Sequence, residues 1–490
     1  MNLKLIFIYL GLLSTELLIA QNQITELSLK QVIEMARMES PDAQTARHSF
    51  RSAYWNYKYY RANYLPSLSL TSDPNLNRAI NKITMGDGSV KFVEQNLLNT
   101  DLTLNLSQNI PWTGGSLFLE TSAQRMDLFS EHKYSWQTSP IMIGYRQSLF
   151  GYNSLKWDRR IEPVRYQEAK KNYVETLELV SANAINKFFA LATAQSNYDI
   201  ASFNYANADT LYRYAQGRYN IGTITENEML QLELNRLTEE TNRMNARIEM
   251  DNCMQELRSY LGIQEEREIR VRVSSRIPNF SINLNEALAL AYENSPDIQT
   301  MKRRKLESES AVARARANAG LKADIYLRFG LTQTADKLPE AYRNLLDQQY
   351  VSLSISLPIL DWGRGKGQVR VARSNRDLVY TQVEQNRTDF ELNVRKLVKQ
   401  FNLQTQRVRI AARTDETAQR RNEVARKLYI LGKSTILDLN ASISEKDSAR
   451  RNYVSALYNY WSLYYTLRSM TLYDFERNTM LTEDYHLLIE

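Results

Sequence analysis

The chain has 490 residues and a formal net charge of +7, and it contains only 16 glycines and 10 prolines. So few turn-forming residues favour long uninterrupted elements. The positive charge is spread along the chain, without basic runs flanked by aromatic residues, and solvated helix faces explain it better than nucleic-acid binding. The three histidines (His48, His132 and His486) lie far apart in the sequence, and no metal-ligand spacing, phosphate-binding loop or nucleophile elbow is present. The sequence therefore predicts neither an enzyme nor a cofactor or metal site.

The N-terminus has the pattern of a secretory signal peptide. Lys4 precedes an apolar run from Leu5 to Leu13, and Ala20 is followed by polar residues. Residues 1–20 are therefore predicted to be removed on export. No later run approaches the roughly 20 apolar residues that a membrane-spanning helix needs.

The remaining chain contains one plan twice. Ser40-Pro41-Asp42 recurs as Ser295-Pro296-Asp297, each after a short amphipathic segment, and places a serine cap before a helix with proline at its first position. We predict an internal two-fold repeat, with repeat 1 at residues 21–268, repeat 2 at 269–471 and a C-terminal tail at 472–490.

After these helices, the period of the apolar residues changes from 3.6 to 2. In the clearest case, Val351, Leu353, Ile355 and Leu357 alternate with serines. Strands of this kind, at about 65–149 and 322–359, fit a membrane β-barrel, and the alternative is a soluble β-sandwich. Repeat 1 has one additional hairpin, turning at Pro111–Gly115, and outer loops are expected near 73–99 and 128–139.

Each repeat then continues as a very long amphipathic helix. Apolar residues recur in steps of three and four, which predicts a coiled-coil seam. About 65 residues at ~1.5 Å each give a rod of roughly 100 Å. Return helices are expected near 227–261 and 434–470. Between each pair lies a short glycine-bearing turn, at 218–230 and 428–441.

The strands are too few for one chain to close a barrel. An open strand edge in lipid leaves backbone groups unsatisfied, and the smallest membrane barrels have about eight strands. The sequence offers four to six, so several copies must combine their strands, and their helices must form a joint hollow bundle.

With these features, the chain resembles the TolC-type outer-membrane efflux proteins from about residue 27 to residue 470. The resemblance is carried by the duplicated layout, the two Ser-Pro-Asp helix starts, the Leu360–Gly365 strand-to-helix junction and the two turns. It implies a mixed, mainly α fold, in which a trimeric α-helical barrel is continuous with a shared transmembrane antiparallel β-barrel.

The resemblance also implies a function. Such a protein would be the outer-membrane channel of a tripartite efflux or type I secretion system. It would act with a periplasmic adaptor and an inner-membrane pump, and would export small molecules or proteins passively. It would lie in the lipid of the outer membrane and extend into the periplasm.

In that family the turns dock the adaptor and close the pore. The residues implied in adaptor docking are Ile221, Gly222, Thr223, Leu431, Gly432 and Lys433. Those implied in the periplasmic gate are Asp438, as part of an acidic ring, and Tyr429 with Glu228, as a phenol–carboxylate link between neighbouring helix pairs. Ser434 and Ala441 depart from the family pattern, which suggests a gate with fewer charges and links.

Two alternatives stay open. Asp438 can instead be an ordinary acid at a helix start, and the glycines can be plain turn residues. A periplasmic or surface coiled-coil protein without a pore would explain the long helices, but not the doubled strand segments.

Overall fold

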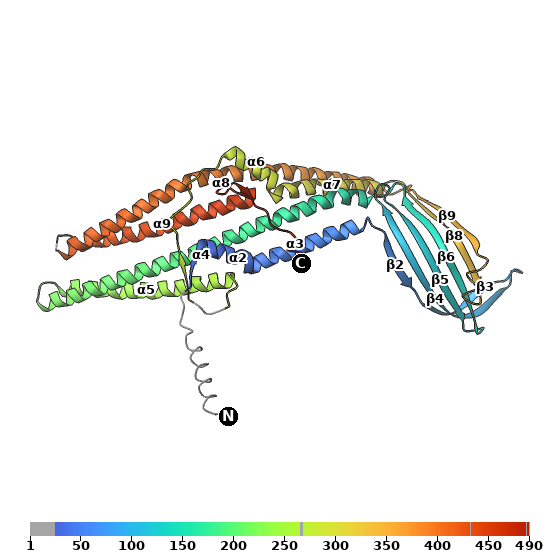
Figure 1. Cartoon of the computed structure of the whole chain (residues 1–490), viewed down its shortest axis with the longest axis horizontal. Helices are drawn as coiled ribbons and strands as arrows, with labels where there is room; N and C mark the ends of the chain where they lie inside the picture. Colours follow the sequence, from blue (N-terminus) through green and yellow to red (C-terminus); the bar gives the residue numbers. More distant parts are fainter. Residues whose placement is uncertain (1–24, 265–267, 432, 487, 490) are drawn as a thin grey trace, which may run out of the picture. The chain divides into compact units, whose positions relative to one another are not determined.

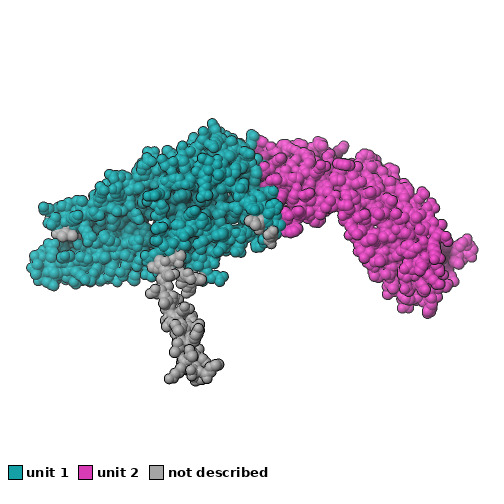
Figure 2. Space-filling view, in the orientation of Figure 1, with its two compact units in different colours: residues 1–51, 169–298, 387–490 teal, residues 52–168, 299–386 magenta. Residues whose placement is uncertain are grey.

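The computed structural model describes residues 25–264, 268–431, 433–486 and 488–489. The predicted signal peptide lies outside these ranges. The chain divides into two compact units, which are coloured separately in Figure 2. Unit 1 comprises Met1–Arg51, Ala169–Ile298 and Arg387–Glu490, and unit 2 comprises Ser52–Glu168 and Gln299–Asn386.

The helices follow the predicted order (Figure 1). They are α2 (Leu29–Glu39), α3 (Pro41–Ala62), α4 (Ser154–Asn220), α5 (Glu226–Tyr260), α6 (Leu284–Asn294), α7 (Pro296–Ala319), α8 (Arg364–Ile430) and α9 (Ile436–Thr471). Ser40 caps α3 by accepting the Ala43 N–H at 3.2 Å, and Ser295 accepts the Asp297 N–H at 3.2 Å at the start of α7. The predicted serine caps are thus confirmed. Within the described ranges, no helix combines the length and the apolar character needed to cross a membrane.

Unit 2 contains an antiparallel sheet in the order β2-β4-β5-β6-β8-β9, with β3 also paired to β4. The strands are β2 (Ser67–Ser72), β3 (Asn75–Thr84), β4 (Val90–Ile110), β5 (Gly115–Leu128), β6 (Lys133–Ser148), β8 (Lys322–Ala335) and β9 (Leu346–Ser356). The predicted outer loops at 73–99 and 128–139 are wrong for most of their length. Their residues continue the strand pairs in register, since Asn75–Thr84 pairs with Val90–Asn99 and Lys133–Ser139 lies in β6.

The helical part of unit 2 is held by aromatic and ionic contacts. The rings of Tyr57 and Tyr166 stack with their centroids 4.4 Å apart. Arg303 of α7 donates to both carboxylate oxygens of Glu168 of α4, from Nε at 2.6 Å and from Nη2 at 3.0 Å. Such bidentate pairs are directional as well as strong, so they fix how α7 lies on α4.

Unit 1 has an aromatic and aliphatic core contributed by the long helices. Phe188 and Leu191 of α4, Phe401 of α8 and Tyr464 of α9 are at most 1% exposed. Strand β1 (Thr25–Ser28) pairs in parallel with β7 (Ile269–Arg272). The segments that precede α2 and α6 are therefore neighbours.

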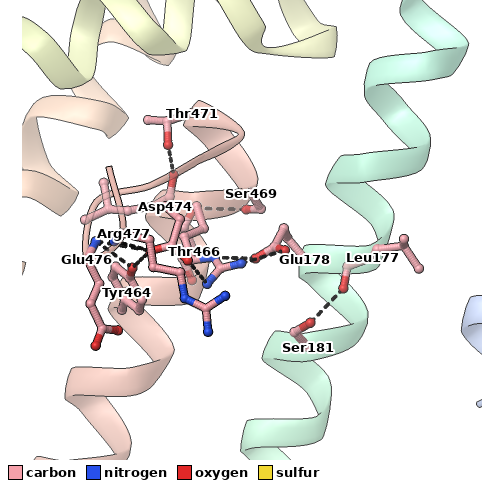
Figure 3. A network of polar contacts seen from close by, with 12 residues as sticks. Leu177, Glu178, Ser181, Tyr464, Thr466, Ser469, Thr471, Asp474, Glu476 and Arg477 are labelled. Carbon is pink, nitrogen blue, oxygen red and sulfur yellow. Dashed lines mark hydrogen bonds and ion pairs between the residues drawn. The ribbon is translucent and has the colours of Figure 1, made fainter. Parts of the chain in front are cut away.

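The C-terminal tail, for which the sequence predicts no structure, is fixed to unit 1 by a buried ion cluster (Figure 3). Glu178 of α4 is fully buried and accepts from Arg37 Nη1 at 2.6 Å and from Arg468 Nε at 2.8 Å. Arg468 also bonds Asp474 in β10 (Tyr473–Asp474), which pairs with β11 (Thr479–Met480). Each buried charge has a partner of opposite sign, as buried charges require.

Candidate functional site

The first turn connects α4 to α5 and depends on one glycine. Gly222 has φ +75°, in the left-handed region that glycine adopts without strain. Its N–H donates to the Tyr219 carbonyl at 2.8 Å, and the Thr223 N–H donates to the Arg218 carbonyl at 2.9 Å. These two bonds form a Schellman motif, which satisfies the last carbonyls of α4. No atom lies within 4 Å of the position that a Cβ would take on Gly222, so within one chain the backbone conformation explains this glycine.

A capping box begins α5 immediately after this turn. Thr225 Oγ1 accepts the Glu228 N–H at 3.3 Å, and Glu228 Oε2 accepts the Thr225 N–H at 3.1 Å. The pair satisfies two backbone donors that a helix start otherwise leaves free. Glu228 therefore has a role within its own turn.

The second turn repeats this arrangement at a constant offset of 210 residues. The Lys433 N–H donates to the Leu428 carbonyl at 2.9 Å, as Thr223 does to Arg218. Thr435 and Asp438 form the capping box of α9: Thr435 Oγ1 accepts the Asp438 N–H at 3.1 Å and donates to Asp438 Oδ2 at 2.7 Å. Gly432 lies outside the described residues. The offset makes Asp438 the counterpart of Glu228, an equivalence that the T-x-x-E/D spacing in the sequence already contains.

The capping box also affects the charge of Asp438. The hydrogen bonds from the Thr435 side chain and backbone lower the pKa of this exposed carboxyl below its usual value, and a 3.4 Å bond from Ser434 Oγ adds to the effect. Asp438 is therefore ionised at neutral pH. The helix-start interpretation of this residue is confirmed, and it leaves a role in a gate open because the carboxylate stays exposed.

The exposed surface of the two turns includes large apolar side chains. Ile221 is 74% exposed and Leu431 is 67% exposed, with Thr223 and Lys433 exposed beside them. Among the described residues of the single chain, no hydrogen bond joins Tyr429 to Glu228, and Figure 1 shows the two turns at the ends of separate hairpins. The Tyr429–Glu228 link stays a prediction for neighbouring helix pairs in an assembly.

The sheet of unit 2 has a continuous apolar face. Consecutive register partners place Leu68, Leu106, Leu119, Ile143 and Phe329 in one row across β2, β4, β5, β6 and β8. Each of these side chains is between 38% and 66% exposed. A contiguous apolar patch of this extent marks a surface that meets lipid or another protein.

Large exposed side chains also lie where the strands end and the helices begin. Trp112 in the β4–β5 turn is 83% exposed, Trp362 after β9 is 90% exposed and Phe150 after β6 is 53% exposed. Aromatic residues of this kind gather at membrane–water interfaces. In the part of the chain that the structure describes, no three His, Cys, Asp or Glu residues lie together as a metal site.

Comparisons with known proteins agree with this geometry. Residues 287–471 match a family of proteins described as outer membrane efflux proteins. The matched segment begins in α6 and ends with α9, so it covers most of the predicted repeat 2. This segment of the chain thus resembles the outer membrane efflux proteins, and the predicted resemblance is confirmed. The description of the matched family refers to efflux.

Solved outer-membrane channels have the same fold over nearly the whole chain. The CmeC outer membrane channel of Campylobacter jejuni has a TM-score of 0.67 at 16% identity, covering 94% of this chain and 88% of CmeC. The outer membrane protein VceC of Vibrio cholerae has a TM-score of 0.63 at 15% identity, covering 90% of this chain and 95% of VceC. The open-state MtrE channel of Neisseria gonorrhoeae has a TM-score of 0.59 at 14% identity, covering 93% and 90%. No curated protein sequence matches the chain.

Proposed function

We propose that this protein is the outer-membrane exit duct of a tripartite efflux or type I secretion system. Three copies would combine their sheets into one β-barrel in the outer membrane and their helices into one hollow α-helical barrel in the periplasm. The observation that carries the proposal is the exposed apolar row across the sheet, because a soluble protein would leave that row in water at a large cost in free energy.

The edges of the sheet support assembly from several copies. Strand β2 and strand β9 are the two ends of the strand order, and each has a partner on one side only among the described strands. Unpaired strand edges do not occur in the hydrocarbon region of a membrane. Each edge therefore needs a strand from a neighbouring copy.

The interfacial side chains support the placement of the sheet in lipid. Trp112, Phe150 and Trp362 all lie at the end of the strands where the helices begin. We assign this end of the sheet to the periplasmic interface of the membrane, where the indole groups would contact the lipid headgroups.

For the helical turns we propose the two roles that the resemblance implies. Ile221, Gly222, Thr223, Leu431, Gly432 and Lys433 would dock a periplasmic adaptor. The exposed Ile221 and Leu431 are suited to apolar contact with the adaptor, and Lys433 is suited to contact with a carboxylate. Asp438, with Tyr429 and Glu228, would line and hold the periplasmic gate. Outer-membrane efflux channels in general work with an adaptor and an inner-membrane pump.

Single-channel recording in planar bilayers tests this function. The purified full-length protein should give discrete conductance steps, and its migration on SDS gels should change on heating as the barrel unfolds. A protein that stays soluble without detergent and gives no steps would instead be a coiled-coil protein without a pore.

Site-directed crosslinking in cells tests the docking role. A photoreactive residue at Ile221 or Leu431 should capture an adaptor of the periplasm, whereas one at Met244, an exposed residue of α5 well away from the turn, should not. Capture from Met244 alone, or from none of the three positions, would contradict the docking assignment.

A further inference from the structure

The two repeats contribute unequal numbers of strands to the sheet of unit 2. Repeat 2 contributes β8 after α7 and β9 before α8. In repeat 1, β2 follows α3 and β6 precedes α4, so these two strands are the counterparts of β8 and β9. The hairpin β4–β5 lies between them and has no counterpart. We call β4–β5 the inserted hairpin.

Strands β2 and β3 occupy one position in the sheet. Ser72 pairs with Leu102 and Asn75 pairs with Asn99, so both strands keep one register against β4. Asp73 and Pro74 interrupt the strand, because proline has no N–H to donate to the ladder. The sheet therefore has six strand positions.

We propose that the inserted hairpin is part of the pore wall, so that each copy supplies six wall strands and three copies close a barrel of eighteen. This inference rests on the proposed function and extends it, because it sets the width of the pore in the outer membrane.

The apolar row is the first observation behind this proposal. Leu106 and Leu119, the central members of the row, belong to the inserted hairpin. They are paired to each other and, on either side, to Leu68 and Ile143. The lipid-facing surface therefore passes through the inserted hairpin without a break.

The opposite face gives a second, independent observation. On β4 this face carries Thr103, Asn105 and Ser107, which are suited to a water-filled interior. On β5 it carries Glu120, whose carboxylate accepts from Arg328 of β8 at 3.0 Å. This ion pair connects the inserted hairpin to repeat 2 across β6.

The turn of the inserted hairpin is fixed to the start of α4. Asn153 Nδ2 donates to the Pro111 carbonyl at 3.0 Å and to the Trp112 carbonyl at 3.4 Å, while Asn153 Oδ1 accepts the Lys156 N–H at 2.9 Å. One side chain thus caps α4 and holds the turn. Trp112 is thereby held at the level of the other interfacial aromatic residues.

Close side-chain packing also holds the inserted hairpin in the sheet. A Cβ on Gly144 of β6 would overlap the Phe118 ring of β5, so the ring packs directly on the glycine backbone. On its other side, Phe118 stacks on Tyr326 of β8 at 5.9 Å. Phe118 therefore packs across β6 within the sheet.

A second copy is the partner that fits the two edges. Six strands are fewer than the eight of the smallest membrane barrels. Strand β2 leads away from its helix and β9 leads back to one, so β9 of one copy can pair antiparallel with β2 of the next. Eighteen strands is an even number within the known range, and barrels of about this size enclose an aqueous channel.

Spin-label accessibility in liposomes tests the position of the inserted hairpin. Nitroxides would be attached at Leu106→Cys and Leu119→Cys in a full-length Cys253→Ser background. Ile143→Cys serves as the control for the wall and Asn105→Cys as the control for the interior. The labels at 106 and 119 should be as accessible to oxygen, and as protected from a water-soluble nickel complex, as the label at 143. Labels at 106 and 119 that are accessible to the nickel complex, beside a protected label at 143, would overturn the inference.

Disulfide trapping and imaging test the closure. Ser69→Cys on β2 combined with Ser354→Cys on β9 should give covalent dimers and trimers on oxidation, and electron cryomicroscopy of the detergent-solubilised protein should resolve eighteen strands. Twelve strands, with β2 paired directly to β6, would overturn the inference while the protein still conducts. If the unmodified protein shows no conductance at all, the proposed function itself would be contradicted.

Discussion

The two helical hairpins of unit 1 end in equivalent turns but are joined by different side chains. In the α4–α5 hairpin, Tyr198, Tyr205 and Tyr212 each face an arginine of α5, and the Arg243 guanidinium lies 4.2 Å from the centroid of the Tyr205 ring. In the α8–α9 hairpin, the positions 210 residues after Tyr205 and Tyr212 are Asp415 and Asn422, both 5% exposed.

The contacts of the α4–α5 hairpin should tolerate small shifts between its helices, whereas those of the α8–α9 hairpin require a defined geometry. Cation–π contacts at half-exposed sites contribute about 0.5–1 kcal/mol each and accept small shifts of the ring. By contrast, Asp415 accepts from Arg450 at 3.1 Å, and Asn422 donates to Ser442 at 3.0 Å. Buried polar pairs are costly when mismatched, so they favour one helix register. We therefore expect the α8–α9 hairpin to respond more to conservative substitutions.

The largest expected effect concerns Glu175 of α4, whose counterpart in α8 is the neutral Gln385. Burial, with a smaller contribution from Asp297, raises the pKa of Glu175 to about 7. Because the folded-state pKa is raised, the stabilisation is fully present below the unfolded value near 4.5 and is lost as the pH rises through 7. The free energy of unfolding of the unmodified protein should therefore fall by on the order of 1–3 kcal/mol between pH 4.5 and 8 through this group, and Glu175→Gln should abolish that fall.

Thermal unfolding of the detergent-solubilised protein across this pH range measures the effect. Glu256→Gln, at an exposed ion pair with Lys187, is the matched control and should leave the pH profile unchanged. A Glu175→Gln profile identical to that of the unmodified protein would show that this carboxyl has an ordinary pKa.

The seam difference can be tested with one conservative change in each hairpin. Asp415→Asn removes the charge that faces Arg450 and should destabilise the α8–α9 hairpin by about 1–2 kcal/mol. Tyr205→Phe keeps the ring that faces Arg243 and should cost less than about 0.5 kcal/mol. Hydrogen exchange of the two hairpins would report each change locally. Equal effects in both hairpins would remove the distinction between the seams.

The turns, by contrast, should respond equally. Thr225→Ala and Thr435→Ala each remove a capping-box side chain and should each reduce the local stability of the following helix by about 1 kcal/mol. Amide exchange in the first turns of α5 and α9 measures this loss, and Thr→Ser at the same positions is the control. A loss at only one turn would mean that the two caps are not equivalent.

The smallest effect concerns the pH dependence of the α9 cap. The pKa of Asp438 is lowered by its bonds to Thr435, so the cap is complete above the usual value of 3.8 and weakens as the pH falls through the lower folded-state value. Amide protection at the start of α9 should therefore decrease only below about pH 3.8. Asp438→Asn should make this protection independent of pH, and an unchanged profile in that variant would contradict the assignment.

Much of the architecture was predictable because it follows from local patterns. The 3.6-residue and 2-residue periods predicted the long helices and the strands, and the Ser-Pro starts predicted the beginnings of α3 and α7. The paired turns were found from the repeat of Tyr219, Gly222 and Thr225 at Tyr429, Gly432 and Thr435. Their shared capping boxes were also present in the sequence as T-x-x-E/D, although they were not predicted.

The tertiary structure decided what depends on contacts distant in the chain. The register that joins Asn75–Thr84 to Val90–Asn99 turned a predicted loop into strands, because the apolar residues of β3 (Leu76, Ile80 and Ile83) do not alternate regularly with polar ones. Glu178 lies within an apolar seam, and only the approach of Arg37 and Arg468 explains its burial. The amino-acid sequence by itself thus determined the elements and their repetition, since these depend on neighbours within a few residues. The fixing of the tail and the place of the inserted hairpin in the sheet depend on partners up to several hundred residues away, so only the fold could decide them.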